Sequence, residues 1–201
     1  MFYNKQQDKQ LGIRTTGINR LSPKEYPDNF QTESTDYYVL DELFKEYQFQ
    51  TEGRFVDFGC GKGRVLFYVN YHFKRQVVGI ELNPTSYRQL EENRQNYLNK
   101  YPHAQDMFTL YQGYAEGYAI DPLDTIFYFF NPFALNIVKQ IFNNIMYSIE
   151  THPRSIEIIF YYPNYALDNF IEQIPQLKLH ASVAIQGTHD KNDIINIYKN
   201  I

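Results

Sequence analysis

The sequence predicts an open α/β sheet of about seven strands, mostly parallel, in a three-layer arrangement with helices on both faces. Two observations predict it. Five short runs rich in Val, Ile and Phe alternate with amphipathic segments over residues 36–174. Two alternating segments, residues 177–186 and 194–199, then flank a polar turn, which is typical of an antiparallel hairpin. We therefore expect one antiparallel strand near the C-terminus.

The composition fits one domain of ordinary size. The chain has 201 residues, of which 43% are hydrophobic and 17% aromatic, with no Trp, so Tyr and Phe must fill much of the core. A net charge of −4 argues against a broad basic surface for nucleic acid. The single cysteine, Cys60, excludes an intramolecular disulfide and a cysteine-built zinc site, and no histidines pair at metal spacing. We expect no metal.

The N-terminal region predicts no membrane segment. The first ten residues are polar, and the chain has no run of 18 apolar residues, so we expect a cytoplasmic protein. Residues 1–35 show little periodicity and predict an extended N-terminal arm, set apart from a domain at residues 36–201. A disordered tail is the alternative for residues 1–10. The polar stretches 14–17 and 32–35 are expected to fold over a ligand site.

The first elements of the domain surround a glycine-rich turn. Residues 36–47 predict an amphipathic helix, and residues 55–58 predict a buried strand with Asp57 near its end. Three glycines follow at alternate positions: Gly59, Gly61 and Gly63. Residues 65–73 then predict a helix. A strand, a glycine turn and a helix start together form a nucleotide cradle at the carboxyl edge of a parallel sheet. An ordinary strand-to-helix turn is the alternative.

The glycine spacing separates two kinds of cradle. A dinucleotide site has Gly-x-Gly-x-x-Gly, and here Arg64 would stand at the third glycine, where a large cation fits close packing poorly. Residues 55–63 instead resemble the first motif of the class I S-adenosylmethionine (SAM)-dependent methyltransferases, which have a Rossmann-like fold. Their motif is apolar-apolar-Asp/Glu-apolar-Gly-x-Gly-x-Gly. The resemblance implies that SAM is the cosubstrate and that this loop, with Asp57, holds its methionine end. Lys62 and Arg64 match no Walker phosphate pattern.

An acid follows the second predicted strand. Residues 76–80, with Val77, Val78 and Ile80, predict a second buried strand that ends at Glu81, which comes 22 residues after Gly59. Acids at about this offset accept hydrogen bonds from ribose hydroxyls. The alternative is an acid that faces water. Asn83 and Pro84 then begin a helix to about residue 100.

The third and fourth predicted strands, residues 107–111 and 124–130, end next to further candidate residues. Tyr114 stands where many of the resembled enzymes have an Asp that contacts adenine, and Glu116 is the alternative contact. Asn131-Pro132-Phe133 resembles a shortened Asn/Asp-Pro-Pro-Tyr/Phe motif of amino-group methyltransferases. The resemblance implies that Asn131 orients the acceptor amine and Phe133 lines its pocket. A cap for the next helix is the alternative role of Asn131.

The remaining segments complete the sheet. Residues 135–149 and 165–174 predict helices, and residues 155–161 predict a fifth strand. Cys60 is expected to be a small residue in a crowded loop, although a helix N-terminus can also activate a thiol.

Together, the resemblance implies methyl transfer from SAM to an acceptor, with nitrogen expected. The candidate catalytic residues are Asn131 and Phe133. The candidate cofactor-binding residues are Asp57, Gly59, Cys60, Gly61, Gly63, Glu81, Tyr114 and Asn131. Two alternatives stay open, a nicotinamide-dependent oxidoreductase and a SAM-binding protein without catalysis. Protein, a small molecule and RNA all remain open as acceptors, and the sequence does not indicate an oligomeric state.

Overall fold

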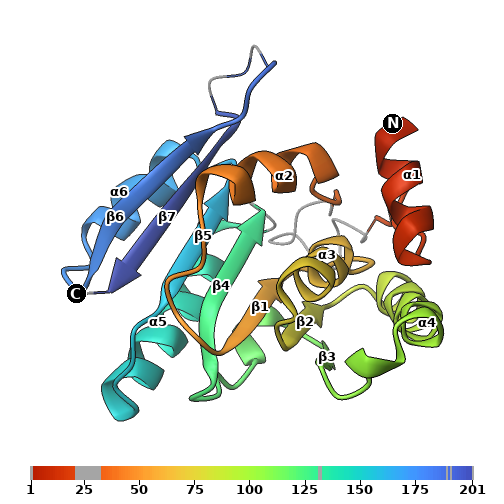
Figure 1. Ribbon diagram of the computed structural model, residues 1–201. Helices are drawn as coiled ribbons and strands as arrows, with labels where there is room; N and C mark the ends of the chain where they lie inside the picture. Colours follow the sequence, from red (N-terminus) through yellow and green to blue (C-terminus); the bar gives the residue numbers. More distant parts are fainter. Residues whose placement is uncertain (1, 21–32, 131–132, 189, 191, 201) are drawn as a thin grey trace.

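The chain forms a single seven-stranded sheet in the computed structural model, which describes residues 2–20, 33–130, 133–188, 190 and 192–200 (Figure 1). The strand order is β3-β2-β1-β4-β5-β7-β6. The strands are β1 Arg54–Phe58, β2 Val77–Glu81, β3 Phe108–Gln112, β4 Asp124–Phe130, β5 Glu157–Tyr161, β6 Leu177–Ala184 and β7 Ile194–Asn200. Strand β7 pairs antiparallel with both of its neighbours, and the other pairs are parallel. The predicted sheet is confirmed.

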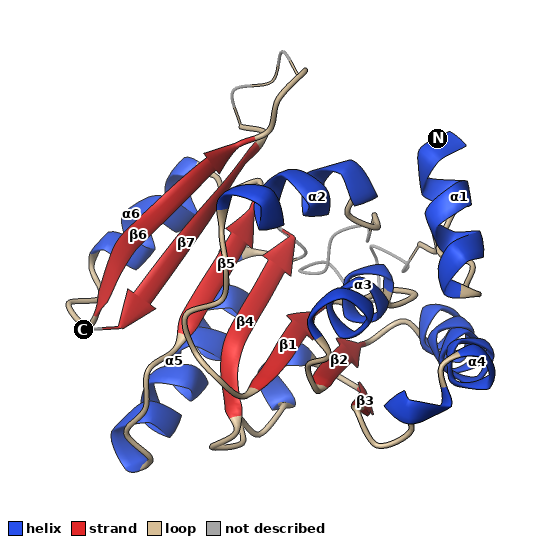
Figure 2. Cartoon of the chain, in the orientation of Figure 1, coloured by secondary structure: helices blue, strands red, loops and turns tan. Residues whose placement is uncertain are grey.

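Helices cover both faces of this sheet (Figure 2). They are α1 Phe2–Leu11, α2 Tyr37–Glu46, α3 Arg64–Phe73, α4 Pro84–Lys100, α5 Leu135–Thr151 and α6 Tyr165–Glu172, with short 3-10 turns η1 Pro102–Ala104 and η2 Ala115–Gly117. Buried residues of α2, α3 and α4 share one hydrophobic cluster with one face of the strands, and those of α5 and α6 share a second cluster with the opposite face. The three predicted layers are therefore present.

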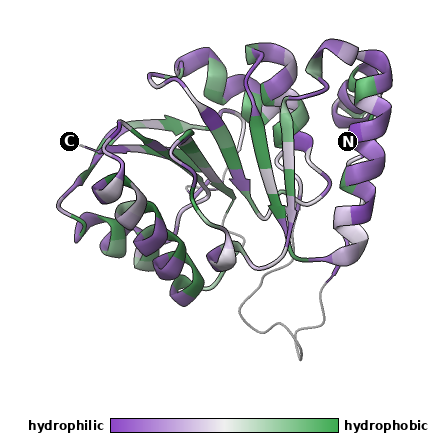
Figure 3. Cartoon of the chain, turned by 90° about the horizontal axis from the view of Figure 1, so that it is seen from below, coloured by the Kyte–Doolittle hydropathy of each residue, from purple (hydrophilic) through white to green (hydrophobic). Residues whose placement is uncertain are grey.

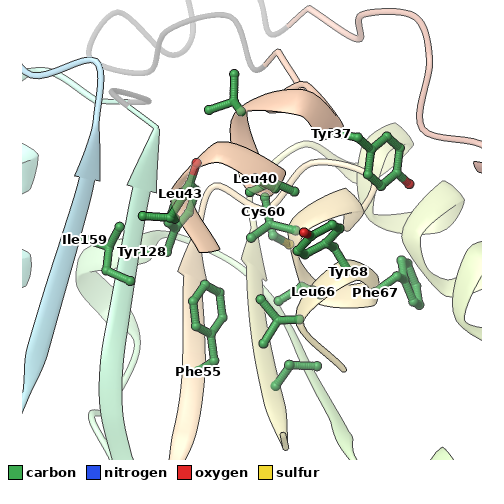
Figure 4. Close-up of a cluster of buried hydrophobic side chains, with 14 of the residues drawn as sticks. Tyr37, Leu40, Leu43, Phe55, Cys60, Leu66, Phe67, Tyr68, Tyr128 and Ile159 are labelled. Carbon is green, nitrogen blue, oxygen red and sulfur yellow. The ribbon is translucent and has the colours of Figure 1, made fainter. Parts of the chain in front are cut away.

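The two-residue period of the strands divides the core between these faces. Phe55 and Tyr128 point toward α2 and α3, and Figure 4 shows them with Leu40 and Leu43 of α2. Phe58 and Phe129 point toward α5. Figure 3 shows the result, with hydrophobic strands between helices that present hydrophilic residues outward. Because side chains alternate along a strand, Asp57 projects from the same face as Phe55.

Local chemistry fixes the beginning of α4. The Asn83 side chain accepts hydrogen bonds from the backbone N–H groups of Thr85 at 2.9 Å and Ser86 at 3.2 Å. Pro84 occupies the first helical position, where the missing N–H removes no helical hydrogen bond. These contacts stop β2 directly after Glu81 and turn the chain away from the sheet edge. Glu81 is left at the carboxyl end of its strand.

The prediction of an extended chain over residues 1–35 is wrong for α1, which is helical. This helix has no apolar stripe, because Asp8 and Leu11 are its buried residues. Hydrogen bonds to α2 hold it instead, with Tyr3 donating to Asp41 and Asn4 donating to Asp36. Hydrophobic periodicity cannot reveal a helix that is held through polar contacts. The boundary near residue 35 stays a prediction, although Leu11 is buried in the same cluster as α2 and α3.

Within the described part of the chain, no helix combines the length and the apolar character needed to cross a membrane.

A substitution at Phe129 tests the packing of aromatic rings in the core. The Phe129 ring is fully buried and stacks against Phe58 at 4.9 Å and Phe160 at 5.1 Å between ring centroids. Phe129→Ala should lower the free energy of unfolding by about 3–5 kcal/mol in urea denaturation, because it leaves a cavity between packed rings. Tyr147→Ala is the control, since Tyr147 is 69% exposed, and it should change stability by less than about 0.5 kcal/mol. Equal losses would contradict this packing.

Candidate functional site

The glycine turn after β1 folds over the end of β2. Gly59, Gly61 and Gly63 have φ angles of 77°, 56° and 87°, which lie in the region that favours glycine. The N–H groups of Gly59 and Cys60 both donate to the carbonyl of Ile80, at 2.9 Å and 3.0 Å. Gly63 then caps α3 at its N-terminus. The turn therefore brings the ends of two adjacent parallel strands together.

Glu81 fixes this turn from the adjacent strand. Its Oε2 atom accepts from the Gly61 N–H at 2.8 Å, and its Oε1 atom accepts from the Asn83 N–H at 2.6 Å. The side chain is 3% exposed, and its burial raises the pKa of the carboxyl group, while these backbone donors oppose the rise. The alternative of an acid facing water is therefore excluded, although each oxygen keeps a second lone pair for a ligand.

Asp57 lies in a different environment from Glu81. Its side chain is 4% exposed, and it accepts no hydrogen bond from another residue in the described ranges. Burial, and then the charge of Glu81, raise the pKa of Asp57 well above its usual range. A cavity of about 20 Å³ lies beside this carboxyl, and Gly59, Arg64 and Thr35 also line it. A buried acid next to a cavity favours a cationic or hydrogen-bond-donating ligand group.

Cys60 is a buried, protonated thiol. Its side chain is 7% exposed, and burial, with the charges of Asp57 and Glu81 adding to it, raises its pKa well above the usual range. A thiolate is therefore disfavoured, and an activated nucleophile is the poorer interpretation of this residue. The thiol also lies against Gly79, where an added Cβ would be 2.9 Å from its sulfur. Cys60 thus packs the turn against β2.

Tyr114 is the residue expected from the sequence to lie near the adenine of a bound nucleoside. It is 51% exposed and follows β3 after Gly113. The Gly113 N–H donates to the backbone carbonyl of Glu81 at 3.1 Å, so the structure brings Tyr114 next to the end of β2. Its neighbour Glu116 contributes a backbone carbonyl, which accepts from Asn144 of α5 at 2.8 Å.

The acceptor motif is described only in part. Asn131 and Pro132 lie outside the described residues, so the role of Asn131 stays a prediction. Phe133 is 7% exposed and belongs to the cluster on the α5 face. Its ring is therefore packed mainly against the core, and little of its surface is exposed to contact a ligand. Phe130, at the end of β4, lines the cavity beside Asp57.

The polar stretches 14–17 and 32–35, expected from the sequence to fold over a ligand site, contribute Thr15, Thr16 and Thr35 to contacts with the start of α3 and with β4. Sequence patterns did not identify the side chains that meet them there. Arg64 Nε donates to Thr15 Oγ1 at 2.7 Å, and Lys62 Nζ donates to the carbonyl of Thr16 at 2.7 Å. Tyr128 of β4 shares a 2.9 Å hydrogen bond with Thr35. The sequence shows two cations, Lys62 and Arg64, on either side of Gly63. It does not reveal their partners, because Thr15 lies 49 positions from Arg64 and Thr16 lies 46 positions from Lys62. No group of His, Cys, Asp and Glu that could hold a metal ion occurs among the residues described.

Comparisons with known proteins identify the fold. No family model and no curated protein matches the sequence. Among solved structures, a human methyltransferase 10 domain containing protein aligns with a TM-score of 0.60 and 11% identity over 99% of this chain and 94% of its own. An RNA methyltransferase from Salinibacter ruber, solved with S-adenosyl-L-homocysteine, gives 0.55 and 16% identity over 84% and 92%. The glycopeptide N-methyltransferase MtfA, complexed with SAM, gives 0.55 and 11% over 81% and 86%.

These likenesses, with the strand order and the antiparallel β7, define the class I, Rossmann-like fold of SAM-dependent methyltransferases. The sequence resemblance at residues 55–63 predicted this fold, and it is confirmed. At 11–16% identity, the likeness establishes the architecture, and function has to be argued from the site.

The raised pKa of Asp57 predicts a pH dependence of stability. The folded chain keeps a proton on Asp57 that the unfolded chain releases above an ordinary carboxyl pKa of about 4. Stability should therefore fall as the pH rises from 4 toward the folded pKa. Asp57→Asn lacks this loss, so in urea unfolding the variant should lose less stability than the wild type between pH 4 and pH 7. Asp106→Asn, at an exposed position, should follow the wild type, and parallel curves for all three proteins would contradict the assignment.

Proposed function

We propose that this protein transfers a methyl group from SAM to a nitrogen atom of an acceptor. The observation that carries the proposal is the Glu81 carboxylate, which is buried at the end of β2 and bonded to Gly61 in the middle of the glycine turn. An acid and a glycine turn at the ends of two adjacent parallel strands suit a nucleoside whose ribose contacts the acid. The Rossmann-like methyltransferase fold places this pair at the edge where such folds bind ligands.

The site residues fit the parts of SAM. The turn formed by Gly59, Cys60, Gly61 and Gly63 would lie along the methionine portion, and Asp57 would accept a hydrogen bond from its ammonium group, since the acid accepts none from another described residue. Glu81 would accept hydrogen bonds from the ribose hydroxyls. Tyr114, exposed after β3, would contact the adenine.

SAM supplies a methyl group that is already activated on a sulfonium. The protein therefore mainly has to align this methyl with an acceptor lone pair.

The acceptor is proposed to bind above the ends of β4 and β5. Asn131 would orient an amine through its side-chain oxygen, and Phe130, Phe133 and Tyr162 would form the walls. Tyr162 follows β5 with a φ of 58°, which is unusual for a residue other than glycine, and its hydroxyl donates to Asp190. Support comes from the position of Phe130, Phe133 and Tyr162 at or just after the ends of β4 and β5. A lysine side chain of a protein or a small amine is the preferred acceptor, and RNA is the other candidate.

A nicotinamide site is disfavoured by Arg64. This residue stands where the third glycine of a dinucleotide fingerprint would be, and its side chain is 4% exposed and bonded to Thr15. The antiparallel β7 between β5 and β6 also departs from the strand order of dinucleotide-binding folds.

Cofactor binding is the first test. Calorimetry should show binding of SAM and S-adenosylhomocysteine and no binding of NAD. Glu81→Ala should weaken SAM binding by about 10- to 100-fold, because hydrogen bonds to a charged group contribute about 1.5–3 kcal/mol. Glu81→Gln keeps an acceptor oxygen and should lose less. Glu91→Ala, on the exposed face of α4, is the control. Unchanged affinity in Glu81→Ala, with the protein folded, would refute the ribose role.

Methyl transfer itself needs an acceptor screen. Purified protein and labelled SAM should be incubated with fractionated lysate, and the label followed into protein, RNA and small molecules. We expect label on nitrogen, and its loss in Asn131→Ala, because that variant lacks the side-chain oxygen proposed to orient the amine. If SAM binds and no fraction accepts label, the chain is a SAM-binding protein without catalysis.

A further inference from the structure

Two cations flank Gly63 and reach away from the glycine turn into the N-terminal arm. Lys62 Nζ donates to the backbone carbonyls of Thr16 at 2.7 Å and Gly17 at 2.9 Å. Arg64, the first residue of α3, reaches the arm on the other side of Gly63. Both side chains are buried, at 8% and 4% exposed. They are therefore committed to the protein itself and are not free for phosphate.

Arg64 joins two parts of the chain that are far apart in sequence. Its Nε donates to Thr15 Oγ1 at 2.7 Å, and its Nη1 donates to the carbonyls of Thr35 at 3.0 Å and Ser34 at 3.3 Å. Thr15 belongs to the polar stretch 14–17, and Ser34 and Thr35 belong to the stretch 32–35. One guanidinium thus holds residues of both stretches against the start of α3.

Acidic and aromatic groups compensate the buried charge of Arg64. Asp8 lies 3.9 Å from its Nε and Asp36 lies 3.6 Å from its Nη1, while the ring of Tyr37 lies 5.0 Å from its guanidinium carbon. Asp8 in turn accepts from the Thr15 N–H and hydroxyl, both at 2.7 Å. A network around a buried charge favours one arrangement of the bonded residues, because breaking it would leave the Arg64 charge buried without its partners.

The segment held by Arg64 forms one wall of the proposed cofactor site. Residues 33–35 line the cavity of about 20 Å³ beside Asp57 and Gly59. Thr35 also shares a 2.9 Å hydrogen bond with Tyr128 of β4, which lines the same cavity. With this wall in place the cavity has room for about one water molecule. A methionine chain therefore requires this wall to move outward and close again.

We propose that Arg64 is a positioning residue that holds residues 33–35 as a movable wall over the methionine end of the SAM site. This inference rests on the proposed function. Arg64 does not touch the reacting atoms. It sets the free energy of moving residues 33–35 outward and back, and cofactor binding is coupled to that equilibrium.

Hydrogen exchange and calorimetry on the full chain test this role. In the ligand-free protein, Arg64→Met should speed amide exchange of residues 12–20 and 33–36 by at least about ten-fold, since local opening becomes easier. Arg64→Lys should show an intermediate effect, and Thr15→Val should act in the same direction from the arm side. The affinity for S-adenosylhomocysteine should fall about ten-fold in Arg64→Met. Saturating S-adenosylhomocysteine should slow the exchange of the same segments in the wild type.

Arg54→Lys is the matched control, because Arg54 is a partly buried arginine paired with Asp124 at the opposite end of β1. It should leave exchange of the arm and ligand affinity unchanged even where it lowers the melting temperature. Normal affinity in both Arg64→Met and Thr15→Val, or arm exchange that S-adenosylhomocysteine does not alter in the wild type, would overturn the inference. If the wild type binds no S-adenosylhomocysteine, the proposed function fails, and unchanged exchange in Arg64→Met would then overturn the anchoring role as well.

Discussion

The hydrogen bond between the Gly61 N–H and the Glu81 carboxylate is the contact on which the rest of the site depends. It joins the turn after β1 to the end of β2 at 2.8 Å. With Gly61 fixed, Gly63 is placed to begin α3, where an added Cβ would come within 2.4 Å of Leu90 in α4. The turn, α3 and α4 therefore have to pack in one arrangement, and this arrangement fixes the position of Arg64 at the start of α3.

The sequence predicted the parts of this arrangement that have local causes. Apolar runs marked the strands, and the alternate glycines marked a turn that only glycine fits readily, because all three have positive φ angles. Glu81 was found because its distance from the turn reflects the length of one strand–helix–strand unit. The parallel part of the sheet could then be expected from the resemblance, because consecutive strand–helix–strand units connect with the same right-handed crossover.

Helix α1 and the long-range partners of the arm could not be predicted by the same reasoning. Helix α1 buries few residues and is held by polar groups, so it has no periodic signal. Arg64 meets Thr15 across 49 positions and Thr35 across 29, and nothing in the local sequence indicates these partners. From the sequence, Lys62 and Arg64 could be considered only as phosphate ligands, and they match no Walker pattern. Their true partners are backbone carbonyls and hydroxyls, which any sequence can offer.

A comparison of the buried acids shows why function is assigned to the carboxyl edge of the sheet. At the amino ends of the strands, Glu157 accepts from Thr51 at 2.6 Å and Asp124 accepts from Arg54 at 2.8 Å. Glu81 is bonded to backbone N–H groups in the same way. Asp57 is equally buried but has no donor from the described residues. A buried acid that accepts no hydrogen bond from the described residues is costly to keep in a fold. A ligand that donates a hydrogen bond or a positive charge there would offset that cost.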